Sequence, residues 1–377
     1  MLVLNVVGAR PNFMKIAPVV EAMRETGLPQ YLVHTGQHYD EKMSRLFFEE
    51  LGIPAPDLNL EVGSGSQAVQ TAEILRRFEP VVLETRPDMV VVVGDVNSTM
   101  ACTLVAVKLG IPVAHIEAGL RSFDRSMPEE INRLVTDSLS DLLFVSEPSG
   151  LENLRSEGVP DEKVYFVGNV MIDTLLRHRE SANRSNVRAR LGVDSGRRYA
   201  LVTLHRPSNV DNLPKLAGLL RALDELAREL PVVFPIHPRT RKNAMEAGLE
   251  PELGRLVTTD PLGYLEFLNL MSNAQVVITD SGGVQEETTV LGVPCLTVRE
   301  NTERPATITC GTNRVVGTDP DAMLRAAREA LHGPRPVGRL PALWDGNAAR
   351  RIVDVLKRTL CTGRISPLRS ASTESRE

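Results

Sequence analysis

Residues 275–296, QVVITDSGGVQEETTVLGVPCL, have the pattern of a complete supersecondary unit. The apolar runs at 276–279 and 293–296 are typical of buried strands, and the segment between them has the length of a helix. An Asp-Ser-Gly-Gly turn joins the first strand to the helix. Two strands joined through a helix run parallel, so this stretch predicts a parallel sheet that carries helices on its faces.

The turn in this unit is similar to a phosphate-binding loop. Ser281, Gly282 and Gly283 offer backbone N–H groups at a helix N-terminus, and glycine lets a diphosphate approach closely. No lysine or arginine stands in the loop, and the first charges after it are Glu286 and Glu287. A carboxylate there suits the helix dipole and accepts both hydrogens of a ribose diol. The loop therefore predicts a nucleoside diphosphate site, with its charge neutralised from across a cleft.

The same alternation of strand and helix runs along the chain in two series. Such continuous apolar strands, joined through helices, predict an α/β fold with two Rossmann-like domains facing a cleft. A polar segment rich in Arg and Asn, ending at residue 198, separates the two series. The strand-length runs are 2–8, 31–36, 89–95, 112–119, 142–146 and 164–168, followed by 199–205, 232–237, 255–260, 276–281, 295–299 and 314–317.

The domain boundaries follow from these series. We expect an N-terminal domain at 1–168 and a C-terminal domain at 169–345, with a hinge near residue 170. A helix at 346–362 follows the second sheet, and we expect it to pack back toward the N-terminal domain. The Ser- and Arg-rich residues 363–377 are expected to be disordered.

Composition excludes several functional classes. The 377 residues are 42% hydrophobic and 24% charged, with a net charge of −5, which is not the basic footprint of a nucleic-acid-binding protein. No apolar run approaches the roughly 20 residues of a membrane span, and no basic leader opens the chain, so we expect a cytoplasmic protein. The four cysteines and seven histidines show no metal-ligand spacing. We expect no metal and no cofactor.

Ligands of open parallel sheets bind beyond the carboxyl ends of the strands, so the residues after each strand are candidates for chemistry. Arg10 follows the first strand at a predicted helix N-terminus, where it can face a phosphate. A surface arginine is the alternative. The loop lacks the GxGxxG of dinucleotide-binding domains, and the second strand ends on His34 and Thr35 rather than on an acid.

Three further strand ends of the first series deliver carboxylates, namely Asp95, Glu117 and the pair Glu129-Glu130. A single acid in such a place is explained by helix capping. Three acids at one edge of a sheet repel one another, so we expect them to be arranged for proton transfer or opposite a cation. Arg133, one helical turn beyond Glu129, is a candidate for that cation or for a phosphate contact, although an exposed helix-surface pair is the alternative.

Two histidines end strands of the second series. His205 follows the run at 199–204, and His237 follows the run at 232–236. A histidine at a strand end is a candidate general acid, or a candidate hydrogen-bond donor to a phosphate group, because its pKa lies near physiological pH. A histidine that is satisfied by backbone carbonyls is the alternative for both.

The motifs together resemble the non-hydrolysing UDP-N-acetylglucosamine 2-epimerases, and they occur in matching order from residue 8 to residue 319. The resemblance implies the glycosyltransferase-B fold, a UDP-sugar substrate, a homodimer, and reversible conversion of UDP-N-acetylglucosamine to UDP-N-acetylmannosamine for cell-envelope polysaccharides. The motifs include GARPNFMKIAP at 8–18, TGQHYD at 35–40, GDVNST at 94–99, HIEAGLRS at 115–122, PEEINR at 128–133 and TDSGGVQEE at 279–287.

Residue by residue, the resemblance implies a catalytic set and a binding set. The implied catalytic set is Asp95, Glu117, Glu129 and His205. The implied contacts to UDP or substrate are Arg10, Lys15, Arg133, Ser281, Gly283, Glu287 and Arg304, to which the strand-end reading adds His237 and Gly282.

Some residues depart from the pattern of bacterial relatives that carry a second, regulatory UDP-sugar site. Many of those relatives have a further Gln or Glu after the Gln-His pair and an Arg in the following helix, whereas here Tyr39 and Asp40 follow Gln37-His38 and Ser66 stands in place of the Arg. The loop HRPSN at 205–209 also replaces the usual His-Arg-Arg-Glu-Asn type. Activation by substrate is therefore not expected. Three alternatives remain: a glycosyltransferase of the same fold, a nucleotide-sugar sensor without activity, and a 2-epimerase that acts on a diacetamido or uronic acid UDP-sugar.

Overall fold

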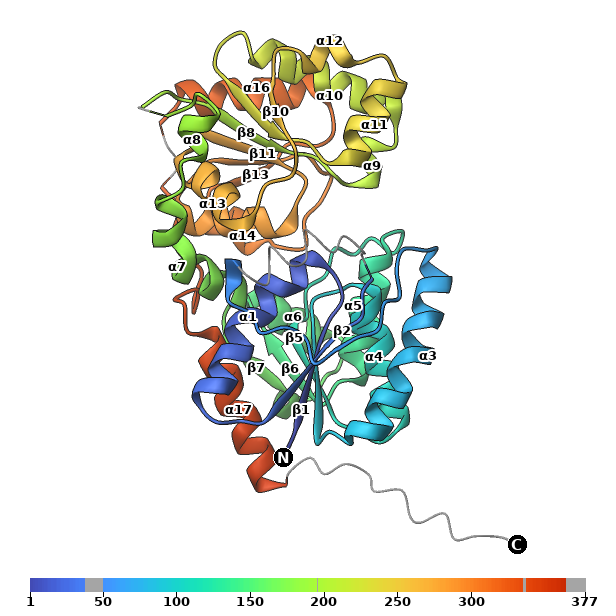
Figure 1. The fold of residues 1–377 in the computed structure, drawn as a ribbon. Helices are drawn as coiled ribbons and strands as arrows, with labels where there is room; N and C mark the ends of the chain where they lie inside the picture. The colour runs from blue at the N-terminus through green and yellow to red at the C-terminus, as the bar shows by residue number, and fades with distance from the viewer. Residues whose placement is uncertain (38–49, 195, 335–336, 364–377) are drawn as a thin grey trace, which may run out of the picture. The chain divides into compact units, whose positions relative to one another are not determined.

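The computed structural model describes residues 1–37, 50–194, 196–334 and 337–363. The chain divides into two compact units. The first contains Met1–Thr174 together with the chain from Ala342 onward, and the second contains Leu175–Pro341. Each unit is built on one sheet with helices on its faces (Figure 1). No helix in the described ranges is long and apolar enough to cross a membrane.

The first unit has a seven-stranded sheet in the order β3-β2-β1-β4-β5-β6-β7. Its strands are β1 (Val3–Val7), β2 (Gln30–His34), β3 (Leu58–Asn59), β4 (Met89–Val93), β5 (Val113–Ala118), β6 (Leu142–Val145) and β7 (Val164–Phe166). Its helices are α1 (Arg10–Glu25), α3 (Gln67–Thr85), α4 (Asn97–Lys108), α5 (Pro128–Leu139), α6 (Pro148–Ser156), the 3-10 turn η1 (Asp161–Lys163) and α17 (Ala348–Thr362). Helix α7 (Val170–Asn183) contains the boundary between the units.

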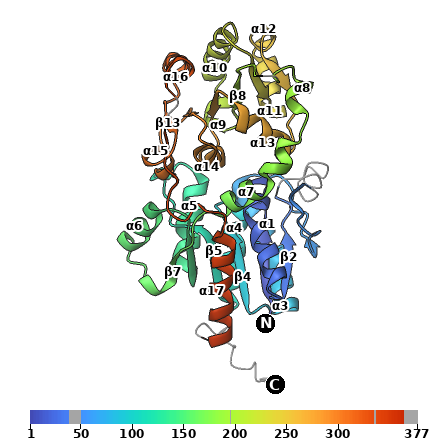
Figure 2. The same cartoon turned by 90° about the vertical axis from the view of Figure 1, so that its left-hand side faces the viewer.

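Burial explains why the strands of this sheet read as continuous apolar runs. Every residue of β1, β4 and β5 is buried, because helices cover both faces. Side chains of α3 and α4, such as Phe78 and Val105, pack with Leu4, Val6 and Val92 of the strands. Helices α1 and α17 lie side by side on the opposite face (Figure 2).

The second unit has a six-stranded sheet in the order β10-β9-β8-β11-β12-β13. Its strands are β8 (Ala200–Thr203), β9 (Val232–Pro235), β10 (Val257–Thr259), β11 (Val276–Thr279), β12 (Cys295–Thr297) and β13 (Asn313–Val315). Its helices are α8 (Val187–Arg190), α9 (Pro207–Val210), α10 (Leu213–Leu226), α11 (Pro238–Glu246), α12 (Glu250–Leu253), α13 (Tyr264–Asn273), α14 (Gly282–Leu291), α15 (Ala306–Thr309) and α16 (Pro320–His332).

A buried core lies between this sheet and helices α10 and α16. Side chains of α10 and α16, such as Leu220 and Met323, pack against Val202 and Ile278 of the sheet. Every strand pairing in the described part of both units is parallel. The prediction of two Rossmann-like domains is therefore confirmed. The structure adds the two-residue strand β3. Of the tail at 363–377 that was predicted to be disordered, residues 364–377 lie outside the described residues.

Both sheets have a topological switch point, where the strand order reverses direction. It lies between β1 and β4 in the first unit and between β8 and β11 in the second. The loops that leave two such neighbouring strands diverge to opposite faces and open a crevice at the carboxyl edge of the sheet. These two edges hold the residues singled out from the sequence.

Candidate active site

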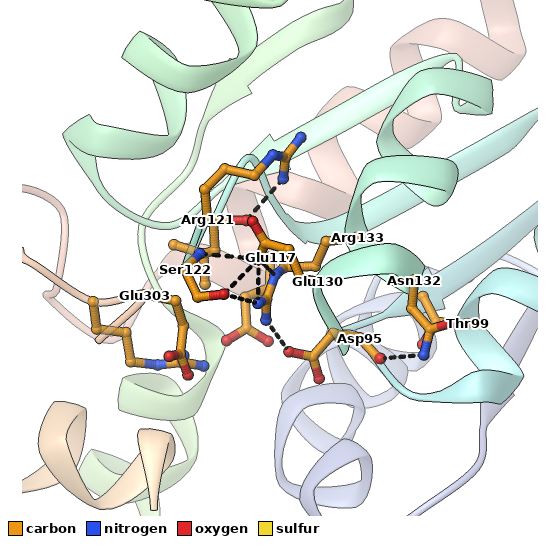
Figure 3. A network of polar contacts seen from close by, with 12 residues as sticks. Asp95, Thr99, Glu117, Arg121, Ser122, Glu130, Asn132, Arg133 and Glu303 are labelled. Carbon is orange, nitrogen blue, oxygen red and sulfur yellow. Dashed lines mark hydrogen bonds and ion pairs between the residues drawn. The ribbon is translucent and has the colours of Figure 1, made fainter. Parts of the chain in front are cut away.

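At the carboxyl edge of the first sheet, Asp95 follows β4, Glu117 ends β5 and Glu129 stands in the first turn of α5. Arg133, from the next turn of α5, holds Asp95 in place. Its Nη1 lies 2.5 Å from Asp95 Oδ2, and the guanidinium is only 2% exposed. Asn132 Nδ2 donates to the backbone carbonyl of Asp95 at 2.8 Å (Figure 3). The Asp95 side chain remains 25% exposed, so it is fixed and still accessible.

Arg133 is shared with a second carboxylate, that of Glu130. Its Nη2 and Nε lie 2.6 Å and 3.1 Å from Glu130 Oε2, so the guanidinium lies between Glu130 and Asp95 (Figure 3). Glu130 also accepts hydrogen bonds from the backbone N–H groups of Ser122 and Phe123. Burial opposes ionisation of Glu130, but Ser122 and Arg133 hold its pKa below the ordinary value. Arg133 is therefore a buried network residue rather than one partner of an exposed helix-surface pair.

Glu117 pairs with Lys15 of α1, and both side chains are buried. The neighbouring Asn12 Nδ2 donates to the carbonyl of Val93 at 2.6 Å, which ties the start of α1 to the end of β4. This places a lysine and a carboxylate side by side at the switch point of the first unit. Helix α1 begins at Arg10, whose side chain lies outside the described part of the structure.

Glu129 differs from the other acids of this edge. Its side chain is half-buried and makes no hydrogen bond or ion pair to any residue in the described ranges. Its place in the first turn of α5 gives its carboxylate a favourable interaction with the helix dipole. Three carboxylates thus reach one edge, two of them paired with buried cations.

At the carboxyl edge of the second sheet, His205 follows β8 and Asp280 follows β11. His205 Nδ1 lies 3.0 Å from Asp280 Oδ1, and the imidazole is 48% exposed, whereas Asp280 is fully buried. Asp280 also accepts from the backbone N–H of Arg206 and from Asn209 Nδ2. Burial opposes its ionisation, but His205 and these donors keep the pKa of Asp280 below its ordinary value. An ionised carboxylate therefore orients the exposed imidazole.

The turn after Asp280 contains no lysine or arginine, but the side chain of Arg304 lies next to its backbone. Ser281 is the N-cap of α14 and makes no side-chain capping bond, and Gly282 opens the helix. A Cβ atom at Gly282 would lie 3.0 Å from Arg304 Nη1. Arg304 is buried and pairs with Glu286 at 2.9 Å and with Glu303 at 2.7 Å. The cation therefore comes from the segment after β12, within the same unit.

Glu287 is buried in α14, where Tyr264 donates its hydroxyl hydrogen to Oε1 at 2.9 Å. Burial, and then the neighbouring Glu286, raise the pKa of Glu287 to about 8. His237 is the N-cap of α11, and its Nδ1 accepts from the Arg239 N–H at 3.2 Å. The imidazole therefore caps a helix through a backbone N–H, not through the backbone carbonyls that were expected as the alternative.

Sequence reasoning named Glu130 only as the neighbour of Glu129, and it missed two further acids of these edges, Asp280 and Glu303. Each of the three is buried and contacts a residue that the sequence did single out, namely Arg133, His205 and Arg304. The available signals were the i,i+3 spacing of Glu130 to Arg133 and the strand-end position of Asp280. Glu303 stands directly before Arg304, and nothing in the sequence showed that it would turn inward.

A family model described as UDP-N-acetylglucosamine 2-epimerase matches residues 21–357. The chain belongs to this family. The UDP-N-acetylglucosamine 2-epimerase of Methanocaldococcus jannaschii is 42% identical over 93% of the chain and 97% of the relative. A crystal structure of the M. jannaschii enzyme in complex with UDP-GlcNAc and UDP covers 95% of this chain and 100% of its own, with a TM-score of 0.89.

A second type of relative has a similar identity to the chain, over a somewhat shorter stretch. The UDP-2,3-diacetamido-2,3-dideoxy-D-glucuronate 2-epimerase of Pseudomonas aeruginosa is 43% identical over 88% of the chain and 92% of the relative. Both relatives are named as 2-epimerases of UDP-sugars, and they differ in the sugar. The chain therefore has the glycosyltransferase-B-like fold of the 2-epimerases and is an isomerase of this class.

Proposed function

We propose that the protein interconverts UDP-N-acetylglucosamine and UDP-N-acetylmannosamine, as a supplier of precursors for cell-envelope polysaccharides. The observation that carries this proposal is the set of carboxylates at the edge of the first sheet. Asp95 and Glu117 each pair with a buried cation, and Glu129 stands beside them without a partner in the described ranges. A glycosyltransferase needs one base at most, whereas inversion at carbon 2 needs proton transfer on both faces of the sugar.

The reaction is an elimination followed by re-addition. The bond between the anomeric carbon and the UDP oxygen breaks, and a carboxylate takes the proton from carbon 2. A glycal-like intermediate and UDP remain bound. The reverse addition delivers a proton to the opposite face of carbon 2 and reforms the bond to UDP. We assign the proton transfers to Asp95, Glu117 and Glu129.

The second unit is proposed to hold UDP throughout this cycle. Backbone N–H groups at Gly282 and Gly283, with Arg304 close to them, suit a diphosphate that gains negative charge as it departs. The Ser281 N–H donates to Thr279 Oγ1 at 3.0 Å, so we propose the Ser281 hydroxyl as its contact to the diphosphate. His205, oriented by Asp280, is the proposed donor to the leaving oxygen. Glu287 is the proposed acceptor for the ribose hydroxyls, and we retain Arg10, Lys15, Arg133 and His237 as proposed substrate contacts.

The second candidate function is 2-epimerisation of a diacetamido glucuronate, because a relative of that name is as similar as the N-acetylglucosamine enzymes. The two candidates are separated by incubating the enzyme with a panel of UDP-sugars and following carbon-2 epimers by proton NMR. Turnover of UDP-N-acetylglucosamine at least tenfold faster than of any other sugar supports the first candidate. Turnover of the diacetamido uronate alone would replace it with the second.

Location and assembly are separate parts of the proposal. We propose a cytoplasmic homodimer, as expected for this family. Sedimentation at micromolar concentration, with and without UDP, distinguishes one copy from two.

A further inference from the structure

Glu117 has a backbone conformation that is rare for a residue with a side chain. Its φ is 75°, in the left-handed region. The register between β5 and β6 also shifts between Ile116 and Ala118, so Glu117 is the extra residue of a bulge. Strained residues of this kind persist only where the surrounding structure holds them, and they cluster at functional sites.

Asp137 of α5 holds both ends of this bulge. Its Oδ1 lies 2.6 Å from His115 Nδ1, two residues before Glu117. Its Oδ2 accepts from the backbone N–H of Gly119 at 3.0 Å, two residues after Glu117. Both His115 and Asp137 are fully buried. The carboxylate of Asp137 therefore contacts the chain both before and after the strained residue Glu117.

The same arrangement reaches the loop that carries Asp95. His115 Nε2 lies 2.8 Å from the carbonyl oxygen of Gly94, the residue before Asp95. Each ring nitrogen of His115 therefore lies next to an oxygen atom, Nδ1 next to Asp137 and Nε2 next to Gly94. Arg121 Nη1, 2.7 Å from Asp137 Oδ2, places a positive charge beside that carboxylate. Burial opposes ionisation of Asp137, but His115 and Arg121 lower its pKa.

We propose that Asp137 and His115 are positioning residues that hold the bulge at Glu117 and, through Gly94, the loop of Asp95. The inference rests on the proposed function, because it assigns these buried residues to the geometry of the two proposed proton-transfer groups. Neither residue reaches the substrate. Their loss is expected to lower the rate of proton transfer at carbon 2 without weakening the binding of UDP to the second unit.

The first test compares Asp137→Asn with Asp141→Asn. Asp141 Oδ2 accepts from the Val113 N–H at 3.0 Å, at the opposite end of the same strand, so it is a matched control. Asp137→Asn removes one acceptor and the charge, and we expect kcat to fall at least tenfold. The Kd for UDP should change less than twofold, and exchange of the carbon-2 hydrogen with deuterium oxide should slow in parallel with kcat. Asp141→Asn should keep wild-type kcat.

The second test uses His115 and does not depend on the folding of Asp137→Asn. An asparagine at 115 keeps a donor at the Nδ1 position toward Asp137, whereas a glutamine keeps one at the Nε2 position toward Gly94. We expect His115→Asn to retain at least threefold more kcat than His115→Gln, because the bulge at Glu117 is held only in the former. Thermal melting of both variants establishes the folded fraction by which kcat is corrected.

The outcomes separate the inference from the proposed function. Wild-type enzyme that turns over no UDP-sugar would overturn both. An active wild-type enzyme whose Asp137→Asn variant has normal kcat, or loses kcat only in proportion to its folded fraction, would overturn the inference alone. The reverse order of the two His115 variants would also contradict it.

Discussion

Individual carboxylates of the candidate site have different electrostatic environments. Asp95 and Glu117 pair with the buried cations Arg133 and Lys15. Glu287 is instead buried beside Glu286, and its pKa is raised to about 8. Two acids of the second unit differ in the same way: burial and Glu286 raise the pKa of Glu287, whereas His205 and further donors keep the pKa of Asp280 below its ordinary value.

This difference predicts how pH affects stability. The ordinary pKa of Glu287 is 4.5, and the folded value is about 8. Between these values the folded chain binds more protons than the unfolded chain, so this group's stabilisation is complete below pH 4.5 and is lost as pH rises toward 8. Glu287→Gln stays neutral. Relative to wild type, its free energy of unfolding should rise by up to about 4 kcal/mol between pH 5 and pH 8.

Denaturant unfolding of both proteins at the two pH values measures this change. Glu246→Gln is the control, because Glu246 is an exposed residue of α11 in the same unit. An equal pH dependence in wild type and Glu287→Gln would show that Glu287 is ionised in the fold.

For single residues, the sequence predicted which acids lie at the carboxyl edge of the first sheet, but it did not predict which cation each acid contacts. Glu129 and Glu130 stand at i,i+4 and i,i+3 to Arg133, and both spacings bring side chains together on a helix. The structure pairs Arg133 with Glu130, because that carboxylate faces inward and also binds the backbone of residues 122 and 123. Only the packing of α5 on its neighbours decides which glutamate turns inward, and helical periodicity does not contain that information.

At the scale of single elements, the N-terminus of helix α14 combines a glycine turn, the helix dipole and the side chain of Arg304, which is distant in sequence. Its first residue, Gly282, approaches Glu303 and Arg304 so closely that a Cβ atom would lie 2.9 Å and 3.0 Å from their polar atoms. Gly282→Ala should displace Arg304 from beneath the turn. We expect the Kd for UDP to rise at least tenfold, measured by calorimetry, with thermal stability within a few degrees of wild type.

Gly65→Ala is the control for this substitution, because its Cβ would make only an ordinary contact, 3.7 Å from Val69. Unchanged UDP affinity in Gly282→Ala would contradict the assignment of Arg304 to the diphosphate site.

Long apolar runs predicted the buried strands, whereas very short strands were not predicted. The runs at 89–95 and 112–119 became β4 and β5, because strands buried on both faces need continuous apolar side chains. Strand β3 has only two residues, one of them exposed, so no periodicity marks it. The bulge at Glu117 was equally invisible, since the residues that hold it, His115 and Asp137, are 22 positions apart.

At the scale of the whole molecule, one architecture occurs twice without a sequence repeat. Each unit brings its candidate residues to the carboxyl edge at a switch point: Glu117 and Asp95 in the first, His205 and Ser281 in the second. This part was predictable, because the strand-end rule applies to any open parallel sheet. The identity of the sugar was not predictable, since relatives named for two different sugars have similar identities to the chain.

The whole enzyme is also expected to lack activation by its own substrate. Ser66, which stands in place of an Arg of the regulated relatives, caps α3, and Gln37 is buried with its amide oxygen 2.8 Å from Ser98 Oγ. Tyr39 and Asp40 lie outside the described residues. Initial rates that start from UDP-N-acetylmannosamine should follow a hyperbola. A sigmoidal dependence that traces of UDP-N-acetylglucosamine relieve would contradict this expectation.

The central claim is that carboxylates of the first unit exchange the carbon-2 proton while UDP is detached. Conversion of UDP-N-acetylglucosamine in deuterium oxide, followed by NMR at carbon 2, tests it most directly. We predict deuterium at carbon 2 of the product, because a carboxylate proton exchanges with solvent. Asp95→Asn, Glu117→Gln and Glu129→Gln should each lower this turnover at least about a hundredfold and still bind UDP. Product that keeps its original hydrogen at carbon 2, or full activity in all three variants, would contradict the account.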